Sequence, residues 1–320
     1  MRHWLSIVCG VATLLGTLPA AAQTYPNRPI TLVVPFAPGS GTDGVARVVM
    51  PRIEAALGQT IVIDNKPGAT GTIGSAIVAR AAPDGYTLLL GGVSSHAASR
   101  ALLKHVPYDP VKDFVAIAKF GVYPFPYLVP KDLPVKTLSE FVAYTKANAG
   151  KVSYAYANAP GRISGEALRR HLGADLTAVP YRASPAAITD LVAGRVQIMV
   201  VDHTTALAQL EGGNIRALST TTQERSALLP GVPGLREQGY GWLELQAWVG
   251  LFAPAGTPDA IVQRFRTELS KALAEPDLIA KLAAVGFEAA KEDPAEFPKK
   301  LEQDIAIWKQ QAEEAGIKPE

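Results

Sequence analysis

Short apolar runs alternate with helix-like segments through the first third of the chain, and this alternation restricts the fold more than any other feature. The apolar runs at residues 30–34, 60–63 and 86–90 have the length and composition of buried strands. Between them, residues 42–57 and 72–82 have helical periodicity and end in helix-stop signals. Strands separated by helices pair in parallel, so the sequence predicts an α/β fold built on a parallel sheet.

The alternation continues to the end of the chain with different spacing. Further strands are expected at residues 127–129, 152–157, 178–179, 196–201, 215–220 and 248–252, and helices at 138–148, 163–172 and 185–193. The tail is expected to be helical, because Phe265 and Leu269, and then Phe297, Leu301 and Trp308, have the spacing of one buried helix face. The middle of the chain therefore has the pattern of a second lobe.

The N-terminus predicts export. Arg2 and His3 precede an apolar run at residues 5–18, and three alanines ending at Ala22 form a small-residue cleavage site, as in a secretory signal peptide. Residues 1–22 would be removed near Ala22, and we expect no membrane insertion afterwards, because the run is shorter than the roughly 20 residues of a membrane span. Cys9, the only cysteine, lies in that segment, so no disulfide is expected.

The charge balance and the side-chain spacing exclude several classes of function. The chain has 31 Lys and Arg against 29 Asp and Glu and a formal net charge of +2, without the basic surface that nucleic-acid binding requires. We therefore expect no nucleic-acid partner. The histidines lack metal-ligand spacing, and the serine in residues 161–165 stands one place too late for a nucleophile elbow. We expect no metal, no cofactor and no enzymatic activity.

A glycine-rich turn at residues 39–44 follows a predicted strand and opens a predicted helix. It matches G-x-G-x-x-G, and Asp64 stands about 20 residues further on, as in a dinucleotide-binding fingerprint. Three interpretations stay open: the backbone N–H groups bind a small anion, the turn is purely structural, or it binds a dinucleotide. An exported protein meets little nicotinamide cofactor, so we favour the small anion. Residues 67–72 and 91–96 form similar turns.

Seven segments, in order and spread over the whole mature chain, carry a resemblance to a known family. They are VVPFAPGSGTD at 33–43, DNKPGA at 64–69, APDGYTLL at 82–89, PYDP at 107–110, VPYR at 179–182, LLPGVP at 228–233 and GLFAPAGTP at 250–258. Together they resemble the Bug receptors, the extracytoplasmic solute-binding proteins of tripartite tricarboxylate transporters. Each segment alone is weak evidence for the family, whereas all seven in this order are specific for it.

The resemblance implies a two-lobed periplasmic-binding-protein fold, type II-like, in which each lobe is a mostly parallel sheet flanked by helices. We place lobe 1 at residues 23–122 plus 221–320 and lobe 2 at 123–220. Such a receptor closes its lobes over a ligand in the cleft between them. The implied ligand is a small organic carboxylate: a di- or tricarboxylate, an amino acid or an aromatic carboxylate.

The resemblance also implies partners and a location. A periplasmic receptor of this family needs no cofactor and delivers its ligand to the membrane permease of the transporter, and we expect it to be a monomer. An exported sensor that presents its ligand to a signalling partner remains an alternative. A dinucleotide-binding or hydrolytic enzyme is the competing class.

Positions in the resemblance give the expected ligand-binding residues. In the first lobe they are Phe36, Gly39, Ser40, Gly41, Thr42, Asp43, Ala69, Ser94 and His96, and in the second lobe Asn158, Ala159, Arg162 and Asp202.

Three second-lobe residues depart from the family pattern. Ala159 lacks the hydroxyl that is usual there, and Arg162 stands about where a histidine is expected. The Arg162 guanidinium either clamps a second carboxylate or lies in solvent. Asp202 stands where the family commonly has Asn, and it would repel a polyanion unless an arginine or a cationic ligand group offsets its charge. Ligands with an amino group or an aromatic body therefore join plain dicarboxylates as candidates.

Overall fold

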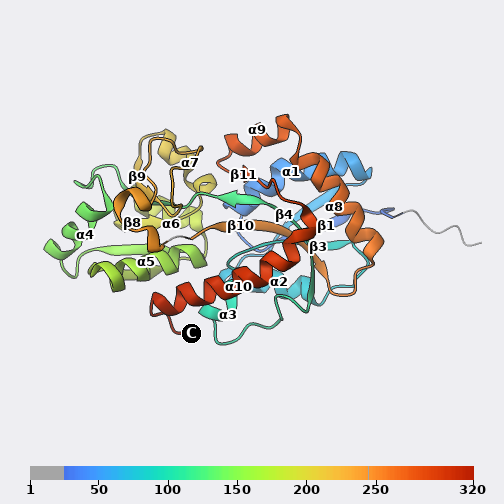
Figure 1. The fold of residues 1–320 in the computed structure, drawn as a ribbon, viewed down its shortest axis with the longest axis horizontal. Coiled ribbons are helices and arrows are strands. Elements are labelled where there is room, and N and C mark those ends of the chain that lie inside the picture. Colours follow the sequence, from blue (N-terminus) through green and yellow to red (C-terminus); the bar gives the residue numbers. More distant parts are fainter. Residues whose placement is uncertain (1–24, 244) are drawn as a thin grey trace, which may run out of the picture.

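The computed structural model describes residues 25–243 and 245–320, so the expected signal peptide at 1–22 lies outside the described residues. Two sheets lie side by side along the long axis of the molecule, each covered by helices (Figure 1). The larger sheet has the strand order β11-β4-β10-β3-β1-β2 and the smaller β7-β6-β8-β5-β9. The two-lobed α/β fold predicted for this sequence is confirmed.

Most strands of each sheet run in one direction. In the larger sheet β1, β2, β3 and β4 are codirectional, and β10 and β11 run against them; in the smaller sheet β6 to β9 are codirectional and β5 opposes them. The strands are β1 (Ile30–Val34), β2 (Ile61–Asn65), β3 (Thr87–Gly92), β4 (Phe114–Tyr123), β5 (Pro126–Pro130), β6 (Ser153–Tyr156), β7 (Thr177–Pro180), β8 (Ile198–Val200), β9 (Ile215–Thr220), β10 (Ala247–Pro254) and β11 (Glu288–Ala289).

Helices cover both faces of the larger sheet, with α1, α8 and α9 on one side and α2 and α10 on the other (Figure 1). In the smaller lobe α5 and α6 pack on the central strands. The α-helices are α1 (Gly41–Leu57), α2 (Thr72–Ala79), α3 (Ser99–Leu102), α4 (Leu138–Ala147), α5 (Ala159–Leu172), α6 (Ser184–Val192), α7 (His203–Glu211), α8 (Asp259–Leu273), α9 (Pro276–Ala284) and α10 (Phe297–Glu314). Four 3₁₀ turns lie at Ala69–Gly71, Arg236–Gln238, Gly241–Leu243 and Pro294–Glu296.

Two of the longer elements were not expected from the sequence. No strand was expected at 114–123, where Lys119 and Gly121 interrupt the apolar run. In the structure this segment is β4, the longest strand described, and its pairing with β10 contains two register shifts. No helix was expected at 203–211, where two β-branched threonines stand near the start. There α7 forms because the Asp202 side chain caps it.

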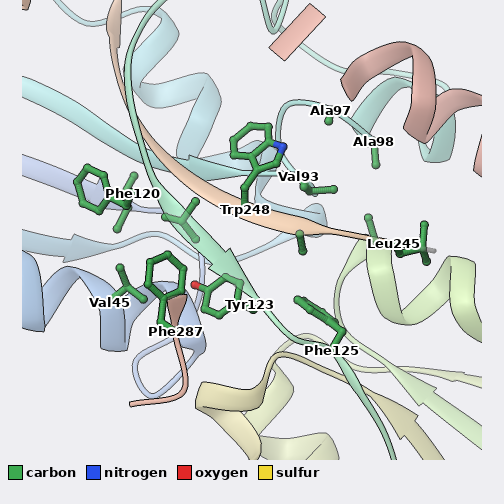
Figure 2. Packing of buried hydrophobic residues seen from close by; sticks show 14 of the residues in the cluster. Val45, Val93, Ala97, Ala98, Phe120, Tyr123, Phe125, Leu245, Trp248 and Phe287 are labelled. Atoms are coloured by element: carbon green, nitrogen blue, oxygen red, sulfur yellow. The ribbon is translucent and has the colours of Figure 1, made fainter. Parts of the chain in front are cut away.

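The chain passes between the sheets at two places that lie side by side. It leaves the larger sheet after Tyr123 and enters the smaller one at Pro126, and it returns between Thr220 and Ala247. The strands pair at this passage, because Tyr123 is opposite Ala247 in one sheet and Pro126 is opposite Thr220 in the other. Figure 2 shows Tyr123 and Phe125 close together where the chain leaves the larger lobe, and Trp248 on the neighbouring strand β10 with its ring pointing away from them.

One hydrophobic core continues from the larger lobe through this passage into the smaller one, and a separate cluster under α6 completes the smaller lobe. The aromatic side chains Phe265, Phe297 and Trp308, expected in the core from helical spacing, are at most 2% exposed. Burial of their apolar surface holds α8 and α10 on the sheet.

Candidate functional site

A small cavity of about 40 Å³ lies between the two sheets, next to the passage strands. Both lobes contribute to its wall. The lining residues are Phe36, Ser40, Gly41, Thr42, Gly92, Val93, Ser94, Tyr123, Phe125, Asn158, Pro160, Ser184, Asp202, Ala247, Trp248 and Val249.

Four helices begin at this cavity. The N-cap or first residues of α1 (Ser40, Gly41), α5 (Asn158), α6 (Ser184) and α7 (Asp202) all line it. A helix N-terminus carries a partial positive charge and N–H groups without intrahelical acceptors, and both features favour an anion. The wall thus offers positive potential from both lobes without a basic side chain.

Side-chain caps fix the directions of three of these helix starts. Ser40 Oγ accepts the N–H of Asp43 at 3.4 Å, and Asn158 Oδ1 accepts the N–H of Gly161 at 2.9 Å. Asp202 Oδ1 accepts the N–H of Thr205 at 2.8 Å. In each case the first turn is held in place by a short polar residue that follows a strand, which is the usual way for an α/β lobe to present a helix start.

Two hydrogen bonds cross the cavity and hold the lobes together. The N–H of Gly41, on the larger lobe, donates to Thr205 Oγ1 at 3.0 Å, and the N–H of Ala159, on the smaller lobe, donates to Ser94 Oγ at 3.1 Å. Each bond joins a helix N-terminus on one lobe to a hydroxyl on the other. The structure therefore represents a closed arrangement in which these two amides are occupied by the opposite lobe.

Asp202 lies on the wall of the smaller lobe, opposite Gly41, and is 6% exposed. A methyl group at Gly41 would come within 2.6 Å of Asp202 Cγ, so the absence of a side chain at Gly41 lets the carboxylate approach α1. Burial raises the pKa of Asp202 above its ordinary value, although the Thr205 hydrogen bonds act in the other direction.

Aromatic side chains form the apolar part of the wall. Phe36, Tyr123, Phe125 and Trp248 line the cavity; Tyr123 ends β4, Phe125 lies between β4 and β5, and Trp248 is on β10 (Figure 2). In the described part of the chain, the buried Tyr123 hydroxyl and Trp248 Nε1 have no hydrogen-bond partner. Burial holds the pKa of Tyr123 well above its ordinary value, so its hydroxyl is a neutral donor.

Seven of the thirteen residues expected at the site line the cavity, and six do not. Those that line it are Phe36, Ser40, Gly41, Thr42, Ser94, Asn158 and Asp202. Those outside the lining are Gly39, Asp43, Ala69, His96, Ala159 and Arg162.

Asp43 lies outside the cavity lining, and its carboxylate stabilises the glycine-rich turn. Its carboxylate accepts the Gly39 N–H at 3.0 Å, the Asn65 side-chain amide at 3.1 Å and two N–H groups of Arg47, each at 3.0 Å. Burial opposes ionisation, but the Arg47 hydrogen bonds and the Gly39 N–H outweigh it and lower the pKa of Asp43. Gly39 takes the left-handed φ of +77° that this turn requires.

His96 is fully buried in the core of the larger lobe. Its ring stacks on Phe252 with a centroid distance of 3.9 Å and contacts Phe114 edge-on, and Nδ1 lies 2.9 Å from Ser95 Oγ. Burial lowers the pKa of His96 to about 3, so the ring is neutral. His96 was expected to contact the ligand because it follows the end of a strand. Instead its ring points into the core, where it packs on Phe252 and Phe114.

Arg162 takes neither of the two placements that the sequence left open. Its guanidinium pairs with the Glu320 carboxylate at 2.7 Å. The backbone of Glu320 bonds to Leu102 and Lys104 of the larger lobe, so the pair joins α5 to the other lobe through the C-terminus. Ala159 is fully buried and contributes its N–H to Ser94, while Ala69, in a 3₁₀ turn, lies outside the lining.

Several cavity residues were not expected from the sequence. Tyr123, Phe125 and Trp248 come from the passage strands, and their signal was only that the chain was expected to cross between lobes near 122–125. Ser184 had a clearer signal, because a serine before Pro185 at the start of a predicted helix is a typical helix N-terminus. The remaining unexpected lining residues are Gly92, Val93, Pro160, Ala247 and Val249.

Two further features of the described residues bear on other functions. Within 25–243 and 245–320, no helix combines the length and the apolar character needed to cross a membrane. No cluster of three or more His, Cys, Asp or Glu side chains suited to a metal ion occurs in the same part of the chain. Asp64, the acidic residue of the dinucleotide-like pattern, pairs with Lys66 at 2.9 Å and does not line the cavity.

Two α/β lobes, connected by paired strands and enclosing a cavity lined by helix N-termini, define a solute-binding protein of the periplasmic type. Residues 45–317 match the model of the TctC family, described as the tripartite tricarboxylate transporter family receptor. The chain belongs to this receptor family. The Bug-type assignment made from seven sequence segments is thereby confirmed.

Relatives and solved structures agree with this assignment. The chain is 32% identical to the protein BugT of Bordetella pertussis over 312 residues, covering 96% of this chain and 95% of BugT. A protein of R. palustris solved with adipate superimposes with a TM-score of 0.89 at 33% identity, covering 92% of this chain and all of the other. MatC from Rhodopseudomonas palustris, solved with bound malate, gives 0.85 at 35% identity, covering 90% and 100%. The family and these structures are binding and transport receptors.

Proposed function

We propose that this receptor captures a small organic carboxylate in the cavity between its lobes and delivers it to the membrane permease of a tripartite tricarboxylate transporter. The observation that carries the proposal is the convergence of four helix N-termini on one cavity, whose described lining residues include no Lys, Arg or His that would bind the anion in their place. Adipate and malate, bound by two structural relatives, are both carboxylates.

In this proposal the ligand's carboxylate is held by neutral donors. Ser40, Thr42, Ser94, Asn158 and Ser184 place hydroxyl or amide groups on the wall, and the positive ends of the helix dipoles favour a negative charge beside them. Dispersed neutral donors suit a receptor, because they stabilise the anion without the desolvation cost of burying a cation beside it.

Closure of the lobes completes the site. The hydrogen bonds from Gly41 to Thr205 and from Ala159 to Ser94 exist only when both lobes meet. Lobe 1 (23–122 plus 221–320) and lobe 2 (123–220) would move about the passage strands, because few chain segments connect them. The ligand shifts the population towards this closed arrangement by contacting both lobes at once.

We further propose that the chain is exported, that its signal peptide is cleaved near Ala22, and that the mature protein acts as a monomer in the periplasm. Expression of residues 1–320 in a bacterial host, followed by fractionation and N-terminal sequencing, tests the first two points. A periplasmic product that begins at Gln23 is expected, and an uncleaved cytoplasmic product would contradict export. Light scattering of residues 23–320 tests the third.

A thermal-shift screen tests binding. Residues 23–320 are heated with malate, adipate, succinate, citrate, L-glutamate or benzoate, and with NAD as the contrasting probe. A ligand at a hundredfold excess over its Kd should stabilise the fold by about 2.7 kcal/mol. Stabilisation by at least one carboxylate and not by NAD is expected. Stabilisation by NAD alone would favour a dinucleotide-dependent enzyme instead.

The transport role needs its own measurement. Uptake of the labelled carboxylate that binds should be lost when the receptor is deleted and restored by the wild-type chain. Uptake that is unchanged by the deletion would favour the alternative of an exported sensor.

A further inference from the structure

Of the lining residues that the structure describes, Asp202 alone has a formally charged side chain. Among the described lining residues there is no Lys, Arg or His, and Tyr123 stays neutral because burial raises the pKa of its hydroxyl. The described residues also form no ion pair with Asp202. A cavity whose helix starts favour an anion therefore also contains one buried, uncompensated carboxylate.

The geometry leaves one oxygen of that carboxylate unused. Oδ1 accepts the N–H of Thr205 at 2.8 Å and its hydroxyl at 2.6 Å. In the described part of the chain, no other residue donates a hydrogen bond to Oδ2. Because the Asp202 side chain lines the cavity, a ligand bound there can donate a hydrogen bond to this oxygen.

A second buried aspartate, Asp43, has a structural role and is paired with a cation. Asp43 is 3% exposed, and Arg47 pairs with it through two hydrogen bonds of 3.0 Å. Asp202 has no such cation. A buried carboxylate without a cation is unfavourable, and here burial raises its pKa.

The cap of α7 does not explain the charge. Asn158 caps α5 in the same cavity with a neutral amide oxygen, which accepts the Gly161 N–H at 2.9 Å. Asn and Asp are about equally good N-caps, so an asparagine at 202 would cap α7 equally well. The capping role accounts for an acceptor at this position and not for a negative charge.

We infer that the ligand of this receptor is a carboxylate that also carries a protonated amine, and that Asp202 Oδ2 receives the ammonium group. This inference rests on the proposed carboxylate-binding function and narrows its substrate class. The ligand's carboxylate lies against the helix starts and hydroxyls, its ammonium group against Asp202, and its apolar body against Phe36, Tyr123 and Trp248.

The test compares carboxylates that differ only in the amino group. The pairs are L-aspartate and succinate, L-glutamate and glutarate, 4-aminobutyrate and butyrate, and L-phenylalanine and 3-phenylpropionate. Calorimetric titration of residues 23–320 should give, for at least one pair, a Kd of the amino compound at least about tenfold below that of its partner, since a charge-assisted hydrogen bond is made only by the former.

Asp202→Asn keeps the cap and removes the charge. In this variant the ratio within the preferred pair should fall to about threefold or less, mainly because the amino compound binds more weakly. Asp293→Asn is the matched control, because Asp293 also caps a helical turn, through the Ala295 N–H at 2.9 Å, far from the cavity lining. It should leave the ratio unchanged. If Asp202→Asn fails to fold, Asp202→Ser supplies an uncharged cap oxygen instead.

The outcomes separate this inference from the function on which it rests. Equal or tighter binding of the compounds without an amine overturns the inference and leaves the carboxylate receptor intact. An amine preference that survives in Asp202→Asn removes Asp202 as its source. If folded wild-type protein binds no carboxylate of either kind, the proposed function itself is contradicted.

Discussion

The N–H of Gly41 and the hydroxyl oxygen of Thr205 lie 3.0 Å apart, although 164 residues separate them in the chain. Thr205 Oγ1 in turn donates to Asp202 Oδ1 at 2.6 Å. A continuous hydrogen-bonded path thus connects the start of α1 on one lobe to the cap of α7 on the other. Closure of the receptor and the position of Asp202 therefore depend on each other.

Gly41→Ala should prevent closure. Its Cβ would lie 2.6 Å from Asp202 Cγ and 3.1 Å from the Tyr123 ring, while alanine favours the helical conformation of α1 more than glycine does. We expect ligand binding to be lost while the midpoint of unfolding without ligand stays the same or rises. Titration calorimetry and small-angle scattering measure this. Gly231→Ala, which meets no atom within 4 Å, is the control. Unimpaired binding by Gly41→Ala would contradict the closed arrangement.

Ser94→Ala should weaken ligand binding without unfolding the protein. It removes the acceptor of the Ala159 N–H, a bond made only between closed lobes, and the affinity should fall about fivefold, equivalent to about 1 kcal/mol. Ser75→Ala is the matched control, since its hydroxyl donates to Gly71 within one lobe. That variant should lower stability and leave the Kd unchanged. An equal effect of both variants on the Kd would remove Ser94 from the site.

Asp202→Asn should change the pH dependence of stability without ligand. Burial raises the pKa of Asp202, so the native state binds this proton more tightly than the unfolded state does. In the wild type, the contribution of Asp202 to the free energy of unfolding is greatest at low pH. It is lost as the pH rises from the unfolded-state pKa of about 3.9 through the raised pKa of the native state. The stability of the variant relative to wild type should therefore increase with pH. Urea unfolding at pH 3 to 7 measures it, and a constant or falling difference would refute the prediction.

His96 should make the fold sensitive to acid. Its pKa is lowered to about 3, so its contribution to stability is complete above the unfolded value of about 6.5 and is lost as the pH falls below that value. The loss approaches about 1.4 kcal/mol per pH unit. In His96→Phe, which keeps the stacking on Phe252, the slope of unfolding free energy between pH 6 and 4 should be shallower by about that amount. An unchanged slope would show that the ring is not buried as a neutral group.

Arg162→Ala should weaken the binding of monocarboxylates and of dicarboxylates by the same factor. The guanidinium pairs with Glu320, outside the cavity lining, so it offers no contact that would distinguish a second carboxylate. The pair is partly exposed, and its contribution to stability should be about 1 kcal/mol or less. Glu320→Ala should reproduce the phenotype if the pair is the cause. A selective loss of dicarboxylate affinity in Arg162→Ala alone would restore the clamp hypothesis.

Local sequence pattern was sufficient for the elements that depend on local chemistry. The apolar run at β1, the helix that begins within residues 39–44 and its stop at Gly58 are all present, because strand propensity, capping and a left-handed glycine act within a few residues. The same local pattern indicated an anion-binding turn at residues 39–44, since a helix start after a parallel strand points to the ligand edge of the sheet, and the family resemblance then named Ser40, Gly41 and Thr42.

Side-chain positions that depend on packing between distant segments could not be predicted from the local sequence. His96 and Ser94 follow the same strand, yet one ring is stacked on Phe252 in the core and the other side chain reaches Ala159 of the opposite lobe. Likewise Tyr123 and Trp248 reach the cavity only because β4 and β10 pair where the chain passes between lobes.

The sequence by itself determined the fold class, the receptor family and the helix starts that favour an anion, because these follow from short-range periodicity and ordered motifs. Tertiary structure alone decided that Arg162 faces Glu320 and that Asp202 is enclosed without a cation. Side-chain direction and desolvation depend on which segments meet in space, and in this protein those segments are more than 100 residues apart in the chain.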